Sequence, residues 1–361
     1  MKIVQLLPEL NEGGVERGVV ELSRELVKKG FESIVISKGG KLVEHIEKEG
    51  GLHVTLDVCS KNIFTAPFRI FKLYQTLKTL GPNILHVRSR VPAWMVFLAN
   101  KFLHLPVVST VHGFNSVSFY SRIMTKSDHI ICVSHAIQQY IQKNYHVDEK
   151  KITIIPRGID VDRFNPKSLD HSFIEAFQRD HNLQNKLVIS TVGRITQLKD
   201  LETFIKAIAI LKVDFPNIIG LIIGGVREDK QNYFTSLLDL IASLNIQEHV
   251  SFCGSTHNVA EVYALSHVIV SSSKKPESFG RSVAEAIALN TPVIATNHGG
   301  VLDIISENIH GYFTNIEDPN DLATKIVLAR DLQFDGYTYI CQNFSLEKMV
   351  IGTLRVYKGF L

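Results

Sequence analysis

The feature that most constrains the fold is a regular alternation of short, strongly apolar runs with segments of helical periodicity. The apolar runs are rich in Val and Ile and nearly continuous, which is typical of parallel strands covered on both faces. They fall at residues 2–7, 33–37, 53–58, 83–88, 106–113, 129–134 and 151–156, and again at 186–194, 218–225, 249–254, 267–273 and 292–296. The two sets predict an α/β chain with two doubly wound parallel-sheet domains.

The length of 361 residues fits two domains, at roughly 150 residues each. Gly, Pro and charged residues interrupt the pattern at residues 157–170. We therefore expect a first domain over 1–165 and a second over 166–344. Residues 345–361 predict an amphipathic helix with Ser345 as its N-cap. Because ligands of open α/β sheets bind beyond the carboxyl ends of the strands, the loops after strands are the candidate sites.

Composition indicates an ordinary globular chain, with 45% hydrophobic and 21% charged residues. No apolar run reaches the roughly 18–20 residues of a membrane-spanning helix, and the N-terminus lacks the pattern of a signal peptide. The four cysteines are scattered without metal-ligand spacing, which predicts buried free thiols in a reducing compartment. They are Cys59, Cys132, Cys253 and Cys341. We expect a cytoplasmic protein.

Charge is distributed unevenly. Residues 1–165 contain 22 basic and 15 acidic residues, a net of +7, and the remainder contains 17 and 21, a net of −4. Between Lys61 and Lys126 there are nine Lys or Arg and no Asp or Glu. Such a block favours an anionic partner, namely acidic lipid, a phosphorylated acceptor or nucleic acid. No nucleic-acid-binding module is recognisable, so we expect no nucleic acid partner. A basic face without a partner is the alternative.

Within this block, residues 66–80 predict a helix whose Ile70, Leu73, Leu77 and Leu80 share one face, beside Arg69, Lys72 and Lys78. The helix either faces the core with a solvated basic edge or lies on an anionic membrane surface. Arg88 and Arg90 follow a predicted strand and are candidates for contact with an acidic acceptor.

Three further features of the first half follow predicted strands. Gly13 and Gly14 precede a helix, where glycine lets backbone amides approach an anion or a sugar, although a plain tight turn fits as well. His112 stands at the carboxyl end of a strand. Ser134 does too, most simply as a helix N-cap.

In the second half, Arg194 and Lys199 lie in a loop that enters a helix. Two cations beside a helix N-terminus suit a diphosphate, and two solvated cations are the alternative reading. Farther on, Glu277 lies in a Pro/Ser/Gly loop and Glu285 in an Ala-rich run.

The spacing of the two acids is informative only if the loop ends between them. In one continuous helix, eight residues rotate about 800° and rise about 12 Å, so the acids would not share a site. With Glu277 in the loop and Glu285 one turn into the helix, both lie near the helix N-terminus. There the amides of Phe279, Gly280 and Arg281 would face a phosphate, and the acids would accept hydrogen bonds from sugar hydroxyls at its two ends.

The stretch "PESFGRSVAEAIA" resembles the E-x7-E motif of retaining glycosyltransferases of the GT-B fold, specifically glycosyltransferase family 4 of the lipopolysaccharide and surface-glycan type. Supporting motifs follow in the family's order: the Gly-Gly loop, "HG", "VS", "GR…K", "F-x-G" and "PVIAT…GG". The resemblance implies two Rossmann-like domains facing across a cleft, with the C-terminal helix crossing back to the first domain.

The resemblance also implies roles for individual residues. Glu277 would contact donor-sugar hydroxyls and Glu285 the ribose, while Arg194 and Lys199 neutralise the diphosphate. The remaining implied contacts are the loop from Ser278 and Phe279 through Gly280, Arg281 and Ser282 beneath the diphosphate, Gly14 beside the donor and His112 near the reacting centre. Gly13, Arg88, Arg90 and Ser134 are candidates on the acceptor side.

Family members of this kind need no divalent metal and no cofactor beyond the nucleotide sugar, here UDP- or GDP-linked. The D-x-D run from Asp160 to Asp162 lies in the expected linker and is not read as a metal site. Two residues depart from the family pattern: Asp200 stands where glycine is usual, and Asp303 where glutamate is more common. Both bear on donor identity.

The resulting prediction is a hexosyltransferase that moves a sugar with retention from a nucleotide sugar to a glycan or lipid-linked acceptor. Front-face attack, with the leaving phosphate taking the acceptor proton, would give retention. The first domain would bind the inner membrane surface peripherally. A UDP-sugar epimerase of the same fold and a non-catalytic partner subunit are the alternatives.

Overall fold

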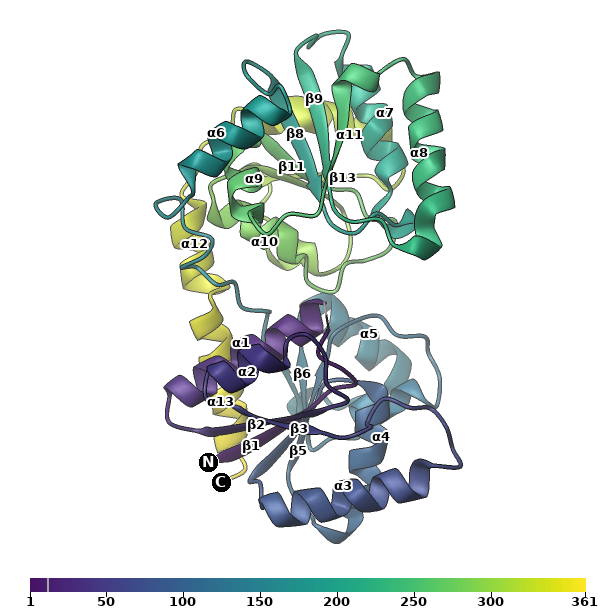
Figure 1. Cartoon of the computed structure of the whole chain (residues 1–361), viewed down its shortest axis with the longest axis vertical. Helices are drawn as coiled ribbons and strands as arrows, with labels where there is room; N and C mark the ends of the chain where they lie inside the picture. The colour runs from purple at the N-terminus through teal and green to yellow at the C-terminus, as the bar shows by residue number, and fades with distance from the viewer. Residues whose placement is uncertain (12) are drawn as a thin grey trace. The chain divides into compact units, whose positions relative to one another are not determined.

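The computed structural model describes residues 1–11 and 13–361 (Figure 1). The chain folds into two compact units, Met1–Gly158 together with Leu346–Leu361, and Ile159–Ser345. Each unit contains one parallel sheet, with seven and six strands respectively. The α/β prediction with two doubly wound parallel sheets is therefore confirmed.

The sheet of the first unit has the order β3-β2-β1-β4-β5-β6-β7. Its strands are β1 Lys2–Leu6, β2 Glu32–Ser37, β3 Leu52–Thr55, β4 Ile84–Val87, β5 Val107–Val111, β6 His129–Cys132 and β7 Ile152–Ile154. Its helices are α1 Gly14–Lys28, α2 Val43–Lys48, α3 Ala66–Leu80, α4 Arg90–Ala99, α5 His135–Tyr145 and α13 Leu346–Lys358. The strand order reverses between β1 and β4, so this unit has a topological switch point there.

The C-terminal helix α13 belongs to the core of the first unit. Its Val350, Leu354 and Tyr357 pack in one cluster with Ile3 of β1 and Leu22 of α1. The apolar face of α13 is thus buried against the first sheet and α1, and the last residues of the chain lie beside the first (Figure 1).

The second unit repeats this plan with the order β10-β9-β8-β11-β12-β13. Its strands are β8 Leu187–Val192, β9 Ile218–Ile223, β10 Val250–Gly254, β11 Val268–Ser271, β12 Val293–Thr296 and β13 Gly311–Thr314. Its helices are α6 His171–Asp180, α7 Leu201–Leu211, α8 Gln231–Ser243, α9 Val259–Leu265, α10 Arg281–Ala288, α11 Pro319–Ala329 and α12 Gly336–Asn343. The order reverses between β8 and β11. The loop after β8 carries the predicted cations, and the loop after β11 with the helix α10 that follows it carries the predicted acids.

The structure corrects three sequence-based expectations. The edge strand β13 was not predicted, because its four residues, Gly-Tyr-Phe-Thr, lack a β-branched apolar run. Arg69 of α3 does not belong to a solvated basic edge, since it is buried against the preceding loop. All four cysteines are free thiols, but only Cys132 is fully buried.

None of the helices among the described residues has the length and apolarity needed to cross a membrane.

Candidate functional site

The loop after β8 brings Lys199 to the switch point of the second sheet. Lys199 ends a short 3-10 turn, Gln197–Lys199, that runs directly into α7. The turn is fastened to the loop after β11, because the Lys274 amide donates to the Leu198 carbonyl at 2.9 Å. Arg194, in the same loop, is exposed. No interaction with another described residue occupies its guanidinium, so it is available to an anion.

Glu277 lies in the loop between β11 and α10, at the position predicted from the sequence. Its carbonyl accepts a hydrogen bond from the Gly300 amide at 2.7 Å, and its backbone pairs with Gly299 as an isolated bridge. Gly299 has φ 82, and a Cβ atom there would lie 2.5 Å from the Glu277 carbonyl oxygen. The Gly-Gly after β12 therefore serves to hold the Glu277 loop by close backbone contact.

Lys199 and Glu277 form an ion pair, with 2.5 Å between Nζ and Oε1. The Ser273 hydroxyl donates to the same oxygen at 2.8 Å. Burial by itself raises the pKa of Glu277, but the Lys199 charge and the two hydrogen bonds outweigh it and hold that pKa below its ordinary value. The carboxylate is therefore ionised at neutral pH. Within the described part of the chain nothing donates to Oε2, which leaves this oxygen for a ligand hydroxyl.

Glu285 stands one turn into α10 and is buried. Its Oε1 accepts from the Arg281 Nε at 2.8 Å, and its Oε2 accepts from the Tyr263 hydroxyl at 3.1 Å. The pKa of Tyr263 is raised well above its ordinary value by burial and by the Glu285 charge, so the phenol stays protonated as a donor. Arg281 and Tyr263 thus hold Glu285 in one orientation.

The N-terminus of α10 lies between the two acids. Gly280 is its N-cap with φ 101, a left-handed conformation, and its carbonyl accepts from the Val283 and Ala284 amides. Phe279 is buried and anchors the loop, while Ser278 and Ser282 are half-buried. The first amides of a helix have no intrahelical acceptor, so residues from Phe279 to Ser282 provide the donors and dipole expected for a phosphate.

Sequence reasoning missed two residues of this loop. Ser273 bonds Glu277, and Lys274 forms ion pairs with Glu317 at 2.7 Å and Asp200 at 3.4 Å. The only signal in the sequence was the polar run "SSSKK" directly after a strand, which marks a strand end without assigning partners.

In the first unit, His112 follows β5 as predicted. Arg157 donates to its Nδ1 at 3.3 Å. Because a guanidinium has no acceptor, Nδ1 accepts and the proton of the neutral ring lies on Nε2. Burial, then the charges of Arg157 and Arg88, lower the pKa of His112 well below its ordinary value. His112 is therefore a neutral N–H donor, and its buried Nε2 has no hydrogen-bond partner among the described residues.

Arg88 is buried at the end of β4. It donates to the Thr110 hydroxyl at 3.2 Å and to the Gly18 carbonyl at 3.4 Å, and burial lowers its pKa to about 10. His86, beside it, contacts the Tyr357 hydroxyl of α13 at 2.5 Å. Arg88 thus takes part in a buried polar network, and an acceptor-binding role for it stays a prediction.

The other acceptor-side candidates lie apart from this network. Arg90 donates to the Ser121 hydroxyl at 3.1 Å and lies over the Tyr120 ring. Ser134 is the N-cap of α5, as its simplest reading predicted, with its hydroxyl accepting from the Ile137 amide at 3.2 Å. Gly13 is the N-cap of α1, and a Cβ at Gly14 would lie 2.8 Å from the Arg157 guanidinium. That guanidinium, which holds His112, therefore reaches the N-terminus of α1.

The described residues contain no group of three or more His, Cys, Asp or Glu side chains placed to hold a metal ion. Metal independence stays a prediction, and so does the absence of a cofactor.

Comparison with known proteins relates both units to one class of enzyme. The family model described as Glycosyltransferase Family 4 matches residues 12–163, and Glycosyl transferases group 1 matches residues 173–333. A crystal structure of a glycosyltransferase from Rickettsia africae is 32% identical, with a TM-score of 0.91 over 99% of this chain and 98% of that one. The chain belongs to the glycosyltransferases of the GT-B fold.

Two curated relatives of this glycosyltransferase are more distant. D-inositol 3-phosphate glycosyltransferase of Stackebrandtia nassauensis is 27% identical over 63% of this chain and 51% of that protein, so the match spans about half of that relative's length. UDP-Gal:alpha-D-GlcNAc-diphosphoundecaprenol alpha-1,3-galactosyltransferase of Escherichia coli is 22% identical over 91% of this chain and 87% of its own. The acceptors in the names of these two relatives differ.

Proposed function

We propose that this chain is a retaining glycosyltransferase that transfers a hexose-type sugar from a nucleotide sugar, UDP- or GDP-linked, to a glycan or lipid-linked acceptor. The observation that carries the proposal is the Lys199–Glu277 pair at the switch point of the second sheet, next to the N-terminus of α10. These residues lie within the part that matches the group 1 glycosyltransferases.

In this proposal the donor lies along the α10 N-terminus. Lys199 and the exposed Arg194 neutralise the diphosphate, whose negative charge grows as the glycosidic bond breaks. The ionised Glu277 uses its free Oε2 to accept from hydroxyls of the sugar, and Glu285 accepts from those of the ribose. Fixed cations and helix amides would then do the work that a divalent metal does elsewhere, so we propose a metal-independent reaction.

The proposed catalytic set is His112, Arg194, Lys199 and Glu277. A neutral histidine that carries its proton on Nε2 donates a hydrogen bond rather than taking a proton, so we assign His112 to hold a substrate hydroxyl. No described carboxylate in the second unit is proposed as a nucleophile, because Glu277 is paired with Lys199 and Glu285 is fixed by Arg281 and Tyr263. We therefore propose front-face attack, with the leaving phosphate accepting the acceptor proton and retention as the outcome.

The acceptor is proposed to be a lipid-linked or surface glycan of the lipopolysaccharide type, met at the inner face of the membrane. The galactosyltransferase relative acts, by its name, on a diphosphoundecaprenol-linked sugar, and the acid-free block from Lys61 to Lys126 suits such an anionic partner. We therefore propose that the protein is cytoplasmic and binds the membrane peripherally.

A test of the proposal is to incubate the protein with nucleotide sugars and a set of lipid-linked acceptors, and to follow both nucleoside diphosphate release and the anomeric configuration of the product by NMR. We expect acceptor-dependent release and an α-linked product from an α-linked donor. A product of inverted configuration would refute the proposed stereochemistry. Conversion of the nucleotide sugar without acceptor would instead identify an epimerase.

A further inference from the structure

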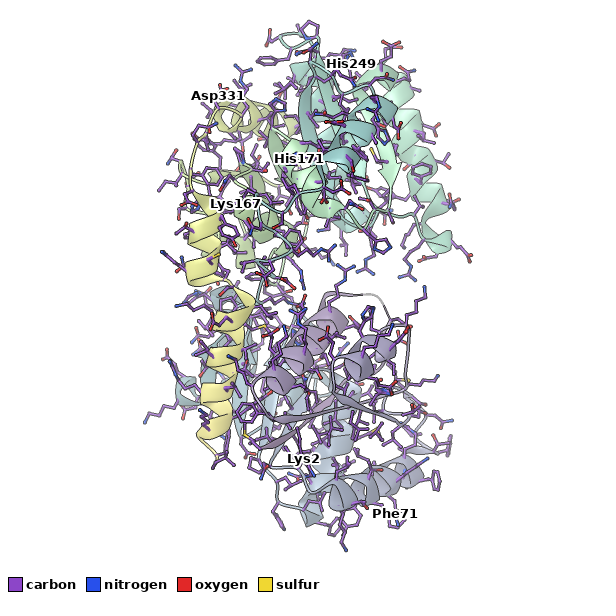
Figure 2. All side chains as sticks on the ribbon, turned by 60° about the vertical axis from the view of Figure 1, so that its left-hand side comes forward. Lys2, Phe71, Lys167, His171, His249 and Asp331 are labelled. Atoms are coloured by element: carbon purple, nitrogen blue, oxygen red, sulfur yellow. The ribbon has the colours of Figure 1, made fainter. Side chains whose placement is uncertain are left out.

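The first unit displays apolar side chains to solvent at the start of α3. Ile63 and Phe64, in the loop before the helix, are 76% and 90% exposed, and Phe68 of α3 is 70% exposed. Phe71, one turn farther along α3, is also exposed and points away from the ribbon in Figure 2. We call these four residues the aromatic wedge. Single exposed apolar residues are ordinary, but four on one loop and helix face indicate a contact surface.

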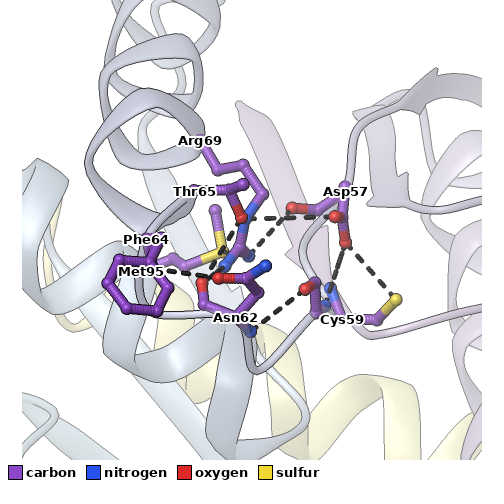
Figure 3. A network of polar contacts seen from close by, with 8 residues as sticks. Asp57, Cys59, Asn62, Phe64, Thr65, Arg69 and Met95 are labelled. Carbon is purple, nitrogen blue, oxygen red and sulfur yellow. Dashed lines mark hydrogen bonds and ion pairs between the residues drawn. The ribbon is translucent and has the colours of Figure 1, made fainter.

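The loop that carries the wedge is held in place by Arg69 (Figure 3). The Arg69 guanidinium donates to the Asn62 carbonyl at 2.8 Å and to the Thr65 hydroxyl at 3.2 Å, and it is 3.6 Å from Met95 Sδ. Arg69 is buried, with 7% of its surface exposed. The basic residue that the sequence assigned to a solvated edge is instead the support of the loop.

The same loop is tied by its own polar groups. Asp57 Oδ1 accepts from the Ser60 amide at 2.9 Å and from the Cys59 amide at 3.2 Å. Asn62 Oδ1 accepts from the Phe64 amide at 2.9 Å. A loop whose backbone is fixed while its apolar side chains face water has already lost the conformational entropy that binding would otherwise cost.

Aromatic residues continue from the wedge along neighbouring elements. The Tyr74 ring of α3 contacts Phe71 on one side and Phe102 on the other, with centroids 6.5 and 6.0 Å apart. Phe102 ends the 3-10 turn Asn100–Phe102 after α4 and is 75% exposed. The adjacent Lys101 lies over the Phe97 ring. An apolar band edged by lysine therefore extends beyond α3.

Exposed cations lie in the loop before α3, on α3 itself and on the segments that follow α4. They are Lys61, Lys72, Lys78, Lys101, Arg122 and Lys126. No acidic residue occurs between Lys61 and Lys126, and Asp57, just before the block, is engaged by the loop amides and lies 3.9 Å from Arg69. Apolar side chains with lysines beside them, and without acids, complement the interface of an anionic bilayer. There Phe side chains enter the boundary between headgroups and acyl chains, and lysines meet the anionic headgroups.

We propose that the aromatic wedge inserts into the interfacial layer of an anionic lipid bilayer and anchors the first unit there. The inserting residues are those of the exposed face, not Leu73 and Leu77, which are buried in the core. This inference rests on the proposed function in one respect: a lipid-linked acceptor would require the enzyme to work at a membrane surface. A second copy of this chain is the competing occupant of the same surface.

The test is co-sedimentation of the full-length protein with vesicles of phosphatidylcholine, with and without phosphatidylglycerol. We expect binding to the anionic vesicles, and the double variant Phe64→Ser/Phe68→Ser should lower the partition coefficient by at least about tenfold, since each ring contributes roughly that factor when buried. The matched control is Val213→Ser in the second unit, an aliphatic residue as exposed as Ile63 at 76%. It should partition as the wild type does.

Replacement of the cations tests the electrostatic part. Lys72→Gln/Lys78→Gln should reduce binding to anionic vesicles several-fold, with little change on neutral ones. Equal partitioning of wild type and wedge variant overturns the proposal, as does no binding to either vesicle. So does a dimer in sedimentation velocity that the wedge variant abolishes in the absence of vesicle binding. A thermal shift with nucleotide sugars on the same samples separates the two proposals, because the wedge variant should keep it.

Discussion

Asp200 combines a left-handed backbone with a buried carboxylate at the start of α7. Its φ is 49, and only 1% of its surface is exposed. Burial raises the pKa of this carboxyl above its ordinary value, although Thr203 and Lys274 act in the opposite direction. Lys274 lies 3.4 Å from it, on the loop that leads to Glu277. The pair therefore joins the loop of Lys199 to the loop of Glu277.

Lys274→Met should destabilise the protein by about 1–2 kcal/mol, because it leaves the Asp200 carboxylate buried without its cation. This is less than the loss from a fully buried pair, since the ammonium is partly solvated. Asp200→Gly removes both the charge and the left-handed strain, so adding Lys274→Met to it should cost about 0.5 kcal/mol or less. Urea unfolding of the four proteins measures the coupling. If the losses of unfolding free energy in the two single variants add up to the loss in the double variant, the Lys274–Asp200 ion pair does not contribute to stability.

The hydrogen bond from Ser273 to Glu277 can be tested separately from the charge of Glu277. Ser273→Ala removes one of the two hydrogen bonds to Glu277 Oε1 and should lower kcat/KM several-fold, while Glu277→Gln removes the charge as well and should lower it by about 10²-fold or more. Steady-state kinetics with the identified donor measures both. An equal fall of kcat/KM in the two variants would show that the charge of Glu277 does not contribute to donor turnover.

The residues identified from the sequence are those whose local spacing along the chain already indicates a common site. Glu277 and Glu285 were identified because the chain changes from loop to helix between them, which places both residues near the N-terminus of α10. Lys274 was missed because its partner Glu317 lies 43 residues away and only the fold brings it near. Ser273 was missed although Glu277 is only four residues away, because a polar run after a strand does not show which side chain turns back toward the acid. Arg69 was assigned to the wrong environment, since helical periodicity does not reveal a loop packed over one residue.

Among the elements, β4 and α13 are joined by a buried polar contact with a pH signature. His86 is fully buried between the Tyr357 and Thr110 hydroxyls. Burial, and then the Arg88 charge, hold the pKa of His86 well below its ordinary value. The imidazole is neutral in the folded state, whereas in the unfolded chain it takes a proton below a pH of about 6.5. Stability should therefore fall as the pH drops below that point.

His86→Gln should flatten this dependence. A glutamine keeps a donor and an acceptor but takes no proton, so the slope of the unfolding free energy between about pH 6 and pH 5 should decrease by up to about 1.4 kcal/mol per pH unit. Urea unfolding at several pH values gives the slope. An unchanged slope in the variant would mean that His86 is protonated in the folded protein.

Elements with strong periodicity were predictable and short ones were not. The helix at 66–80 has the predicted bounds, because its apolar positions recur at helical spacing and Gly81 ends it with a left-handed conformation. The strand Gly311–Thr314 was missed, since an edge strand of four residues has little apolar sequence of its own. Its place is set by pairing with β12.

For the chain as a whole, the sequence predicted two parallel sheets but not the order of their strands. In both sheets the sequential order of the strands reverses after the third strand in space. This happens between β1 and β4 in the first sheet and between β8 and β11 in the second. Short right-handed connections restrict the possible strand orders. The choice among the remaining orders depends on contacts between segments that are far apart in the sequence. Candidate residues nevertheless lie at both switch points, because the segments that follow β1, β4, β8 and β11 carry them.

The ion pair of Lys199 and Glu277 is central to the proposed nucleotide-sugar site, in which Glu277 binds the sugar and Lys199 neutralises the diphosphate. Isothermal titration calorimetry of UDP and of the matching nucleotide sugar, on wild type, Glu277→Gln and Glu285→Gln, tests it most directly. We expect Glu277→Gln to bind the nucleoside diphosphate as wild type does but to lose the added affinity for the sugar, while Glu285→Gln should weaken the binding of both ligands. Unchanged affinity for the nucleotide sugar in Glu277→Gln, or no nucleotide-sugar binding by the wild type, would contradict it.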